Sequence, residues 1–382
     1  MLNKIVSAVQ EKSGEIFFLY GPGGTGKTFL YNTLCHHLHA QNKIVLCVAF
    51  SGIASILLKG GHTAHSCFKI PIPAHESTTC GFSKNSQLAE LIHATDLVIW
   101  DEAPMQHRHV METVDCSFQD MCGSDSPFGG LNVVFGGDFK QIVPVIVKGS
   151  CAQIVNACIQ WSTLWSSMTV LHLKHNMQLN LDIEAEQNFA KWQLEVGQGL
   201  HTDPGGNITL PNYFCCPENT VESLINSIYP GINAPNLPDS YFSEHTILSS
   251  KNDNVNSLNQ QILNLFPGQM QVFHSADSIP PSAHAGEEDA MLNYPVEYLN
   301  SINCSGLPLA ALALKPGCPV MILRNLNPAK GVCNGSRGIV TQCRNCVLEV
   351  WLLTGDHAGE IIFIPWISLS PSEDQVPFKF IC

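Results

Sequence analysis

The sequence predicts an α/β protein in which buried parallel strands alternate with helices. Short apolar runs recur along the first half of the chain, separated by helical or loop stretches. They lie at residues 16–20, 44–49, 97–100, 131–135 and 169–173. Continuous apolar runs are typical of strands that helices cover on both faces. At 382 residues, with 45% hydrophobic and 13% charged residues, the chain suits roughly two or three globular domains.

The first predicted strand runs directly into a phosphate-binding loop. Residues 21–28 meet the pattern Gly-x4-Gly-Lys-Ser/Thr in full. The predicted nucleotide-binding residues are Gly21, Pro22, Gly23, Gly24, Thr25, Gly26, Lys27 and Thr28. The glycines let backbone amides surround phosphate oxygens, and the following helix points its positive dipole end at the anion. A chance glycine-rich turn would not place strand, loop and helix in this order.

Two acidic residues directly follow the predicted strand at 97–100. Lys27 is expected to reach the β- and γ-phosphates of the nucleotide, while the Thr28 hydroxyl and Asp101 hold Mg²⁺. Glu102 is then placed to orient or deprotonate the attacking water. These residues therefore predict a bound nucleotide and Mg²⁺, with Lys27, Asp101 and Glu102 as catalytic residues; ATP as the nucleotide is implied by the family resemblance described below. The alternative is that the acidic pair merely caps the next helix.

Two further segments carry candidate polar and aromatic side chains. The strand at 131–135 leads into Gly-Gly-Asp-Phe-Lys-Gln, whose Gln141 could hydrogen-bond the γ-phosphate and complete the catalytic set. A structural turn is the alternative there. After the strand at 44–49, Ser51 could meet a sugar–phosphate backbone, and His65 and Phe68 could stack on bases. For each of these three residues the alternative is a packed core position.

Composition limits the remaining classes. The formal net charge of −13, with 19 Lys plus Arg, disfavours a nucleic-acid-binding protein that depends on a continuous basic surface. A motor that grips single strands by stacking needs fewer cations. No apolar run approaches the roughly 20 residues that span a bilayer, and the amino terminus lacks a signal-peptide core. The 16 cysteines are scattered, as expected of reduced thiols inside cells, and the Cys343/Cys346 pair indicates a hairpin more than a zinc site.

The second half has longer connections and shorter strands. Surface loops are expected at 201–211 and 231–239, which are rich in Gly, Pro and Asn. Residues 247–265 predict a strand, a capping loop and a helix. Closely spaced strands are predicted at 319–324, 338–342, 347–353 and 360–364. Such strands suggest a small barrel.

Taken together, these motifs resemble the Pif (petite integration frequency) DNA helicases of superfamily one. The version encoded by Helitron transposons is the most similar. Besides the phosphate loop, the segments that carry the resemblance are 51–54, 61–66, 101–105, 136–141, 171–177, 275–278, 308–309, 317–326 and 331–338. They cover nearly the whole chain in collinear order.

The resemblance implies a RecA-like P-loop NTPase domain followed by a partial second RecA-like domain with a small SH3-like β-barrel insert. The implied segments are 1–173 for the motor domain, 174–245 for a connecting region, 246–313 for the partial second domain and 314–382 for the insert. Ser249 and Asn252 would lie near the DNA backbone, and Arg324, Asn334 and Arg337 could face nucleic acid. For Asn334 and the following glycine, a hairpin turn is the alternative.

The same resemblance implies an ATP-dependent 5′→3′ DNA helicase that moves along single-stranded DNA and unwinds duplexes. Its partners would be single-stranded DNA and duplex junctions, with no membrane, and it would act as a monomer. A nuclear or mitochondrial location is implied by the family alone.

Three departures from the family pattern weaken the catalytic expectation. Residues 176–179 read Asn-Met-Gln-Leu, so Gln178 stands where the family carries an arginine that helps bind the γ-phosphate. The adenine-recognising glutamine segment would lie before Met1, and the chain stops at 377–382, before the Lys-Ser-Gln-Gly motif and the last arginine-bearing motif. We therefore expect slow ATP hydrolysis and little unwinding. The alternative is a catalytically defective transposon-derived remnant that binds ATP or DNA without productive turnover.

Overall fold

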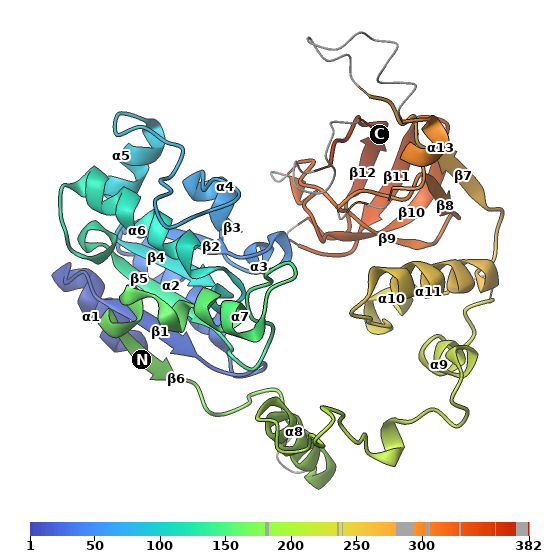
Figure 1. Cartoon of the computed structure of the whole chain (residues 1–382), viewed down its shortest axis with the longest axis horizontal. Coiled ribbons are helices and arrows are strands. Elements are labelled where there is room, and N and C mark those ends of the chain that lie inside the picture. Colours follow the sequence, from blue (N-terminus) through green and yellow to red (C-terminus); the bar gives the residue numbers. More distant parts are fainter. Residues whose placement is uncertain are drawn as a thin grey trace. The chain divides into compact units, whose positions relative to one another are not determined.

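The computed structural model of the chain describes residues 1–179, 183–234, 237–238, 240–279, 294–302, 304, 306–327, 330–355, 357–371 and 381. The chain divides into two compact units, residues 1–209 and 210–382 (Figure 1). The finer division into four segments stays a prediction, and the final residues 372–380 and 382 lie outside the described part. Among the described residues, no helix has both the length and the apolar character needed to cross a membrane.

Unit 1 is built on a six-stranded parallel sheet with the strand order β3-β2-β4-β5-β1-β6. The strands are β1 (Ile16–Tyr20), β2 (Val45–Ala49), β3 (His62–Thr63), β4 (Leu97–Asp101), β5 (Asn132–Gly137) and β6 (Met168–His172). All five predicted apolar runs form strands of this sheet, so the α/β prediction is confirmed. The short strand β3 at the edge was not predicted.

Helices cover both faces of this sheet. They are α1 (Leu2–Glu11), α2 (Lys27–His39), α3 (Gly52–Ile56), α4 (Ala64–Phe68), α5 (Gln87–Ala94), α6 (Arg108–Cys122) and α7 (Cys151–Ala157), with short 3-10 turns that include η1 (Ala103–Met105). Helix α8 (Glu184–Gly197) follows β6 and buries no side chain. Phe17 and Leu19 of β1 pack in one apolar cluster with α1 and α2, whereas Ile16 and Phe18 pack in the other with α4, α5 and α6. Successive side chains of a strand point to opposite faces, which is why these strands are apolar throughout.

Unit 2 combines short helices with two antiparallel sheets. The helices are α9 (Val221–Ile228), α10 (Tyr241–Glu244), α11 (Asn252–Leu265) and α13 (Val296–Leu299). Strands β7 (Gln271–His274) and β8 (Ala311–Leu314) form one sheet, and β9 (Pro319–Met321), β10 (Arg337–Arg344), β11 (Val347–Leu352) and β12 (Ile361–Pro365) form the other in the order β12-β11-β10-β9. The four strands predicted after residue 314 are thus confirmed. Their SH3-like character stays a prediction.

The predicted strand that begins at residue 247 is wrong. Residues 245–249 adopt no regular structure, and Leu248 is 89% exposed. Ile247 and Leu248 are apolar, but apolar residues form a strand only where a neighbouring strand pairs with them and a core covers them. The helix predicted after it is confirmed as α11.

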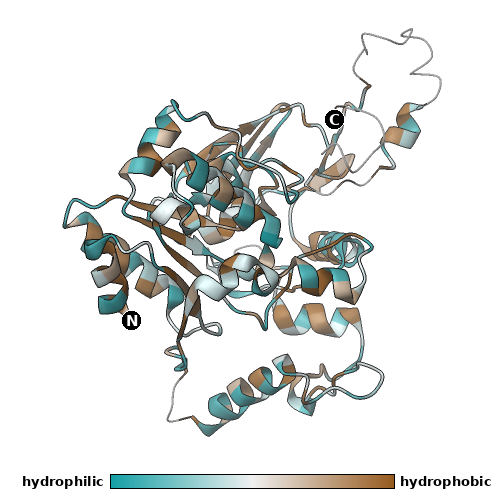
Figure 2. Ribbon diagram, turned by 60° about the vertical axis from the view of Figure 1, so that its left-hand side comes forward, coloured by the Kyte–Doolittle hydropathy of each residue, from teal (hydrophilic) through white to brown (hydrophobic). Residues whose placement is uncertain are grey.

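Figure 2 shows largely hydrophobic strands in the six-stranded sheet, with mixed colouring on the helices that cover it.

Candidate nucleotide-binding site

The phosphate loop joins β1 to α2 at the carboxyl edge of the sheet. Gly24 and Gly26 have φ angles of +76° and +87°, a region that side chains with a Cβ rarely adopt. Lys27 Nζ donates to the Gly21 carbonyl at 2.6 Å and lies 3.4 Å from the Pro22 carbonyl. The ammonium group therefore rests on its own loop, within the turn that a phosphate group would enter.

Asp101 ends the central strand β4 and is only 6% exposed. Its Oδ1 accepts the backbone N–H of Glu102 at 2.9 Å. Burial raises the pKa of Asp101, while the Glu102 amide, the Lys27 ammonium and the Tyr31 hydroxyl each lower it. The structure thus brings the lysine of the phosphate loop and the acidic residue of β4 into one site, as predicted.

Glu102 is held in an unusual backbone conformation beside this carboxylate. Its φ of +54° lies in the left-handed region, although it is not a glycine, and it precedes the 3-10 turn η1. Burial, and then the neighbouring Asp101 charge, raise the pKa of Glu102, while Lys27 lowers it. A carboxylate with a raised pKa is a stronger base than an exposed glutamate. Strained conformations of this kind are found preferentially at functional sites.

The segment after β5 forms a tight turn at the same edge of the sheet. Asp138 is buried, and its Oδ1 accepts the Lys140 N–H at 3.0 Å. The Gln141 N–H lies 3.2 Å from the Asp138 carbonyl, and the Gln141 side chain is exposed. The structural turn is therefore present. The role of Gln141 as a phosphate sensor stays a prediction.

A second segment lies directly on the phosphate loop. The Met177 N–H donates to the Gly24 carbonyl at 2.8 Å. A Cβ on Gly24 would lie 2.3 Å from Asn176 Oδ1, so the two residues are in close contact. Asn176 Oδ1 also accepts the N–H of the exposed Gln178 at 3.0 Å. Sequence reasoning predicted no role for Asn176 itself, because nothing local marks a contact with a loop some 150 residues earlier.

The three candidate DNA contacts near α3 and α4 have different environments. Ser51 caps α3, since its hydroxyl accepts the Ala54 N–H at 3.2 Å. His65 is partly buried, and burial lowers its pKa. Phe68 is fully buried, with ring centroids 5.7 Å from Trp100 and 5.4 Å from Phe118. The predicted base stacking by Phe68 is therefore wrong, because no part of its ring reaches the surface.

The candidate arginines of unit 2 already bind backbone carbonyls. Arg324 donates to the Gly306 and Ser370 carbonyls at 3.0 and 2.8 Å. Arg337 Nη2 donates to the Phe242 carbonyl at 2.6 Å. These bonds assign both side chains a structural role that the sequence did not predict.

The other three unit 2 candidates lie in turns or at a helix start. Asn334 and the following glycine form a turn, which confirms the turn alternative, and the Asn334 N–H donates to Asn325 Oδ1 at 2.8 Å. Ser249 precedes α11, and Asn252 is its first residue. DNA contacts by Asn334, Ser249 and Asn252 stay predictions.

Replacing Arg337 by alanine is expected to destabilise unit 2 by about 1–2 kcal/mol, because the buried Phe242 carbonyl loses its charged donor. Urea unfolding followed by tryptophan fluorescence and circular dichroism would measure the change. Arg344→Ala is the matched control, since Arg344 bonds only to the exposed Gln342 side chain in the described structure. Equal unfolding midpoints for the two variants would contradict the structural role.

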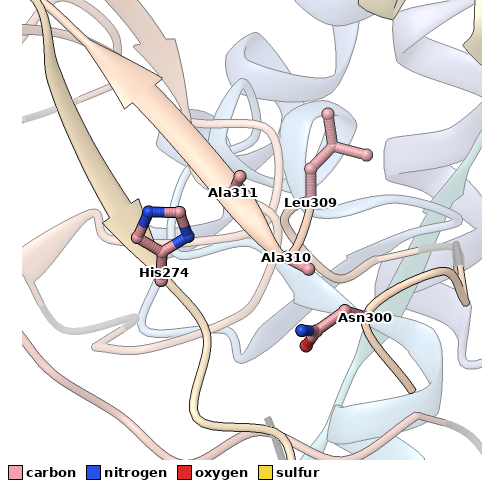
Figure 3. Close-up of a pocket in the computed structure, with 5 residues that line it drawn as sticks. All are labelled: His274, Asn300, Leu309, Ala310 and Ala311. Carbon is pink, nitrogen blue, oxygen red and sulfur yellow. The ribbon is translucent and has the colours of Figure 1, made fainter. Parts of the chain in front are cut away.

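A pocket of about 310 Å³ in unit 2 contains none of the predicted site residues. His274, Asn300, Leu309, Ala310 and Ala311 line it, with His274 at the end of β7 and Ala311 at the start of β8 (Figure 3).

No group of three or more metal-ligating side chains occurs in the described part of the chain. Cys343 and Cys346 lie at the β10–β11 hairpin, as the hairpin alternative predicted.

The fold and the site together define a P-loop NTPase with a RecA-like α/β core. The sequence profile of PIF1-like helicases matches residues 1–206, and that of the 2B domain of DNA helicase Pif1 matches residues 297–343. The chain belongs to the PIF1-like helicase family. The predicted affinity to the Helitron branch stays a prediction.

Known relatives agree with this assignment. The chain is 28% identical over 332 residues to the ATP-dependent DNA helicase Pif1 of Psychrobacter sp., a match that covers 86% of this chain and 44% of the relative. It is 26% identical over 330 residues to ATP-dependent DNA helicase PIF1 of Danio rerio, again covering 44% of that protein. The chain thus spans less than half the length of these relatives.

Solved structures show the same fold. The structure of Bacteroides Pif1 bound to single-stranded DNA matches with a TM-score of 0.64 at 22% identity, covering 100% of this chain and 77% of the other. Pif1 helicase from Candida albicans matches with a TM-score of 0.59 at 19% identity, covering 99% and 82%.

Proposed function

We propose that this chain binds ATP with Mg²⁺ and couples ATP hydrolysis to 5′→3′ movement along single-stranded DNA, with unwinding of duplexes. The observation that carries the proposal is the meeting of Lys27, Asp101 and Glu102 at one edge of the sheet. The Lys27 ammonium is near enough to both carboxyl groups to lower their pKa values. Membership of a helicase family supports the coupling to DNA.

The donor set fits a magnesium ion. Mg²⁺ prefers oxygen ligands, and two oxygen donors are available here: the Thr28 hydroxyl at the start of α2 and the Asp101 carboxylate at the end of β4. When bound, the ion neutralises the charge that develops on the phosphates. Lys27 leaves the Gly21 carbonyl to bind the β- and γ-phosphates, and Glu102 accepts a proton from the attacking water. Gln141 senses the γ-phosphate.

The proposed partners are single-stranded DNA and duplex junctions. Among the solved relatives, Bacteroides Pif1 is bound to single-stranded DNA, and two coordinating Pif1 helicases unwind forked double-stranded DNA. In this chain Ser51, His65, Ser249, Asn252 and Asn334 remain the candidate contacts. We place the protein in the nucleus or the mitochondrion, acting as a monomer.

The test is the steady-state ATPase rate with and without single-stranded oligonucleotide. We expect the oligonucleotide to raise the rate of the wild type, and Glu102→Gln, which keeps the size of the side chain but removes the base, to abolish the stimulated rate while still binding nucleotide. A wild-type rate that is indifferent to DNA would contradict the proposal.

One residue favours a second function. Gln178 lies in the segment that contacts the phosphate loop through Met177 and Asn176, and it carries no charge with which to stabilise the transferred phosphoryl group. The second candidate is a protein that binds ATP or DNA without productive turnover. The second candidate would be favoured if the wild type bound nucleotide without measurable hydrolysis and Gln178→Arg restored hydrolysis.

A further inference from the structure

Tyr31 is a polar residue in the apolar layer beneath the nucleotide site. It lies on α2, one turn after Thr28, and packs with Phe17, Leu19 and Val134. Its side chain is fully buried. Among the residues that the structure describes, Tyr31 Oη makes no hydrogen bond of ordinary geometry. A buried hydroxyl without a partner costs free energy, and phenylalanine would fill the same space without that cost.

Gly136 shows where the phenol oxygen lies. A Cβ built on Gly136 would be 1.6 Å from Tyr31 Oη and 2.9 Å from its Cζ. The oxygen thus occupies the space above β5 that a side chain of residue 136 would fill. Only glycine leaves that space open.

The neighbouring strand brings Asp101 to the same place. Trp100 of β4 pairs with Phe135 of β5, so the next residues along, Asp101 and Gly136, lie side by side. Strands in a sheet are about 4.8 Å apart, and laterally paired residues point to the same face. The phenol oxygen at Gly136 is therefore beside the Asp101 carboxyl group. Burial first, and then the Asp101 charge, raise the pKa of the Tyr31 phenol, which stays protonated and is a hydrogen-bond donor.

The geometry points to Tyr31 as a positioning residue whose hydroxyl donates a hydrogen bond to the Asp101 carboxylate and fixes the orientation in which that carboxylate meets Mg²⁺. This inference rests on the proposed function of the site. A hydrogen bond to a charged acceptor is shorter and stronger than one between neutral groups. Groups that orient a metal ligand from behind affect metal affinity strongly, although they never touch the metal.

The test is Tyr31→Phe, which removes one oxygen and keeps the ring. Binding of a fluorescent ADP analogue is measured across a range of free Mg²⁺ and again in EDTA. We expect the variant to need about 10-fold more Mg²⁺ for the same nucleotide affinity. Affinity in EDTA is expected to be unchanged, and thermal unfolding is measured beside it to show that the variant is folded.

Tyr241→Phe is the matched control. Tyr241 is also buried, and its hydroxyl donates to the Pro230 carbonyl at 3.2 Å within unit 2. We expect this control to bind nucleotide with the Mg²⁺ dependence of the wild type. The same Mg²⁺ dependence in Tyr31→Phe and wild type would overturn the inference while leaving the proposed function standing. A wild type that binds no nucleotide would overturn both.

Discussion

Replacing Lys27 by alanine is expected to lower the rate of ATP hydrolysis by at least about 10²–10³-fold. Lys27 begins α2 and is the side chain of the phosphate loop that can neutralise the β- and γ-phosphates. In the described structure its ammonium group is held by the Gly21 and Pro22 carbonyls at the mouth of the loop. Without it, the charge that develops on the transferred phosphoryl group has no fixed cation from this loop.

Steady-state phosphate release, with single-stranded DNA present, would measure this change. Lys43→Ala is the matched control, because it removes the same charge from unit 1 at the opposite edge of the sheet. Lys43 pairs with Asp96 at 2.9 Å, just before β2 and β4 begin. We expect the control to hydrolyse ATP as the wild type does. A Lys27→Ala protein that keeps most of its activity would show that the phosphates bind elsewhere.

Phe68→Ala is expected to destabilise unit 1 by about 3–5 kcal/mol. The ring is fully buried between Trp100 of β4 and Phe118 of α6, so its removal leaves a cavity in the larger apolar cluster of the unit. The rigid sheet and its helices can close such a cavity only in part. Urea unfolding would report the loss as a lower midpoint.

Phe29→Ala makes the same chemical change on α2, where the ring is 78% exposed. Its effect is expected to lie within about 0.5 kcal/mol of zero. The pair of variants separates packing from base stacking. If Phe68→Ala unfolded like the wild type but bound single-stranded DNA more weakly, Phe68 would not be a core residue and would instead stack on bases.

Much of unit 1 was predictable because its signals are local. Each continuous apolar run forms a strand of one sheet, because helices cover both faces and leave neither face exposed to solvent. The phosphate loop is contiguous, so its glycines, Lys27 and Thr28 identify it without any tertiary information. The pair at Asp101 and Glu102 was predictable from a buried strand that ends in two carboxylates.

Other predictions failed where contacts join distant residues. Nothing in the sequence says which side of the five-residue helix α4 faces the sheet, so Phe68 could be read as a stacking platform. Arg337 looked free to bind nucleic acid because its partner is a backbone carbonyl 95 residues earlier, and a carbonyl leaves no mark in the sequence. The strand expected at residue 247 had local apolar residues but lacked a partner strand.

The sequence by itself determined the chemistry of the nucleotide site, because the phosphate loop and the acidic pair are short contiguous motifs whose residue types dictate what they bind. Only the tertiary structure decided what surrounds them. The register of β4 against β5 places Asp101 beside Gly136, and the missing Cβ of that glycine admits the Tyr31 hydroxyl. Likewise, the missing Cβ of Gly24 leaves room for the side chain of Asn176. These contacts depend on how strands and helices pack, and packing between distant segments is set by the whole core.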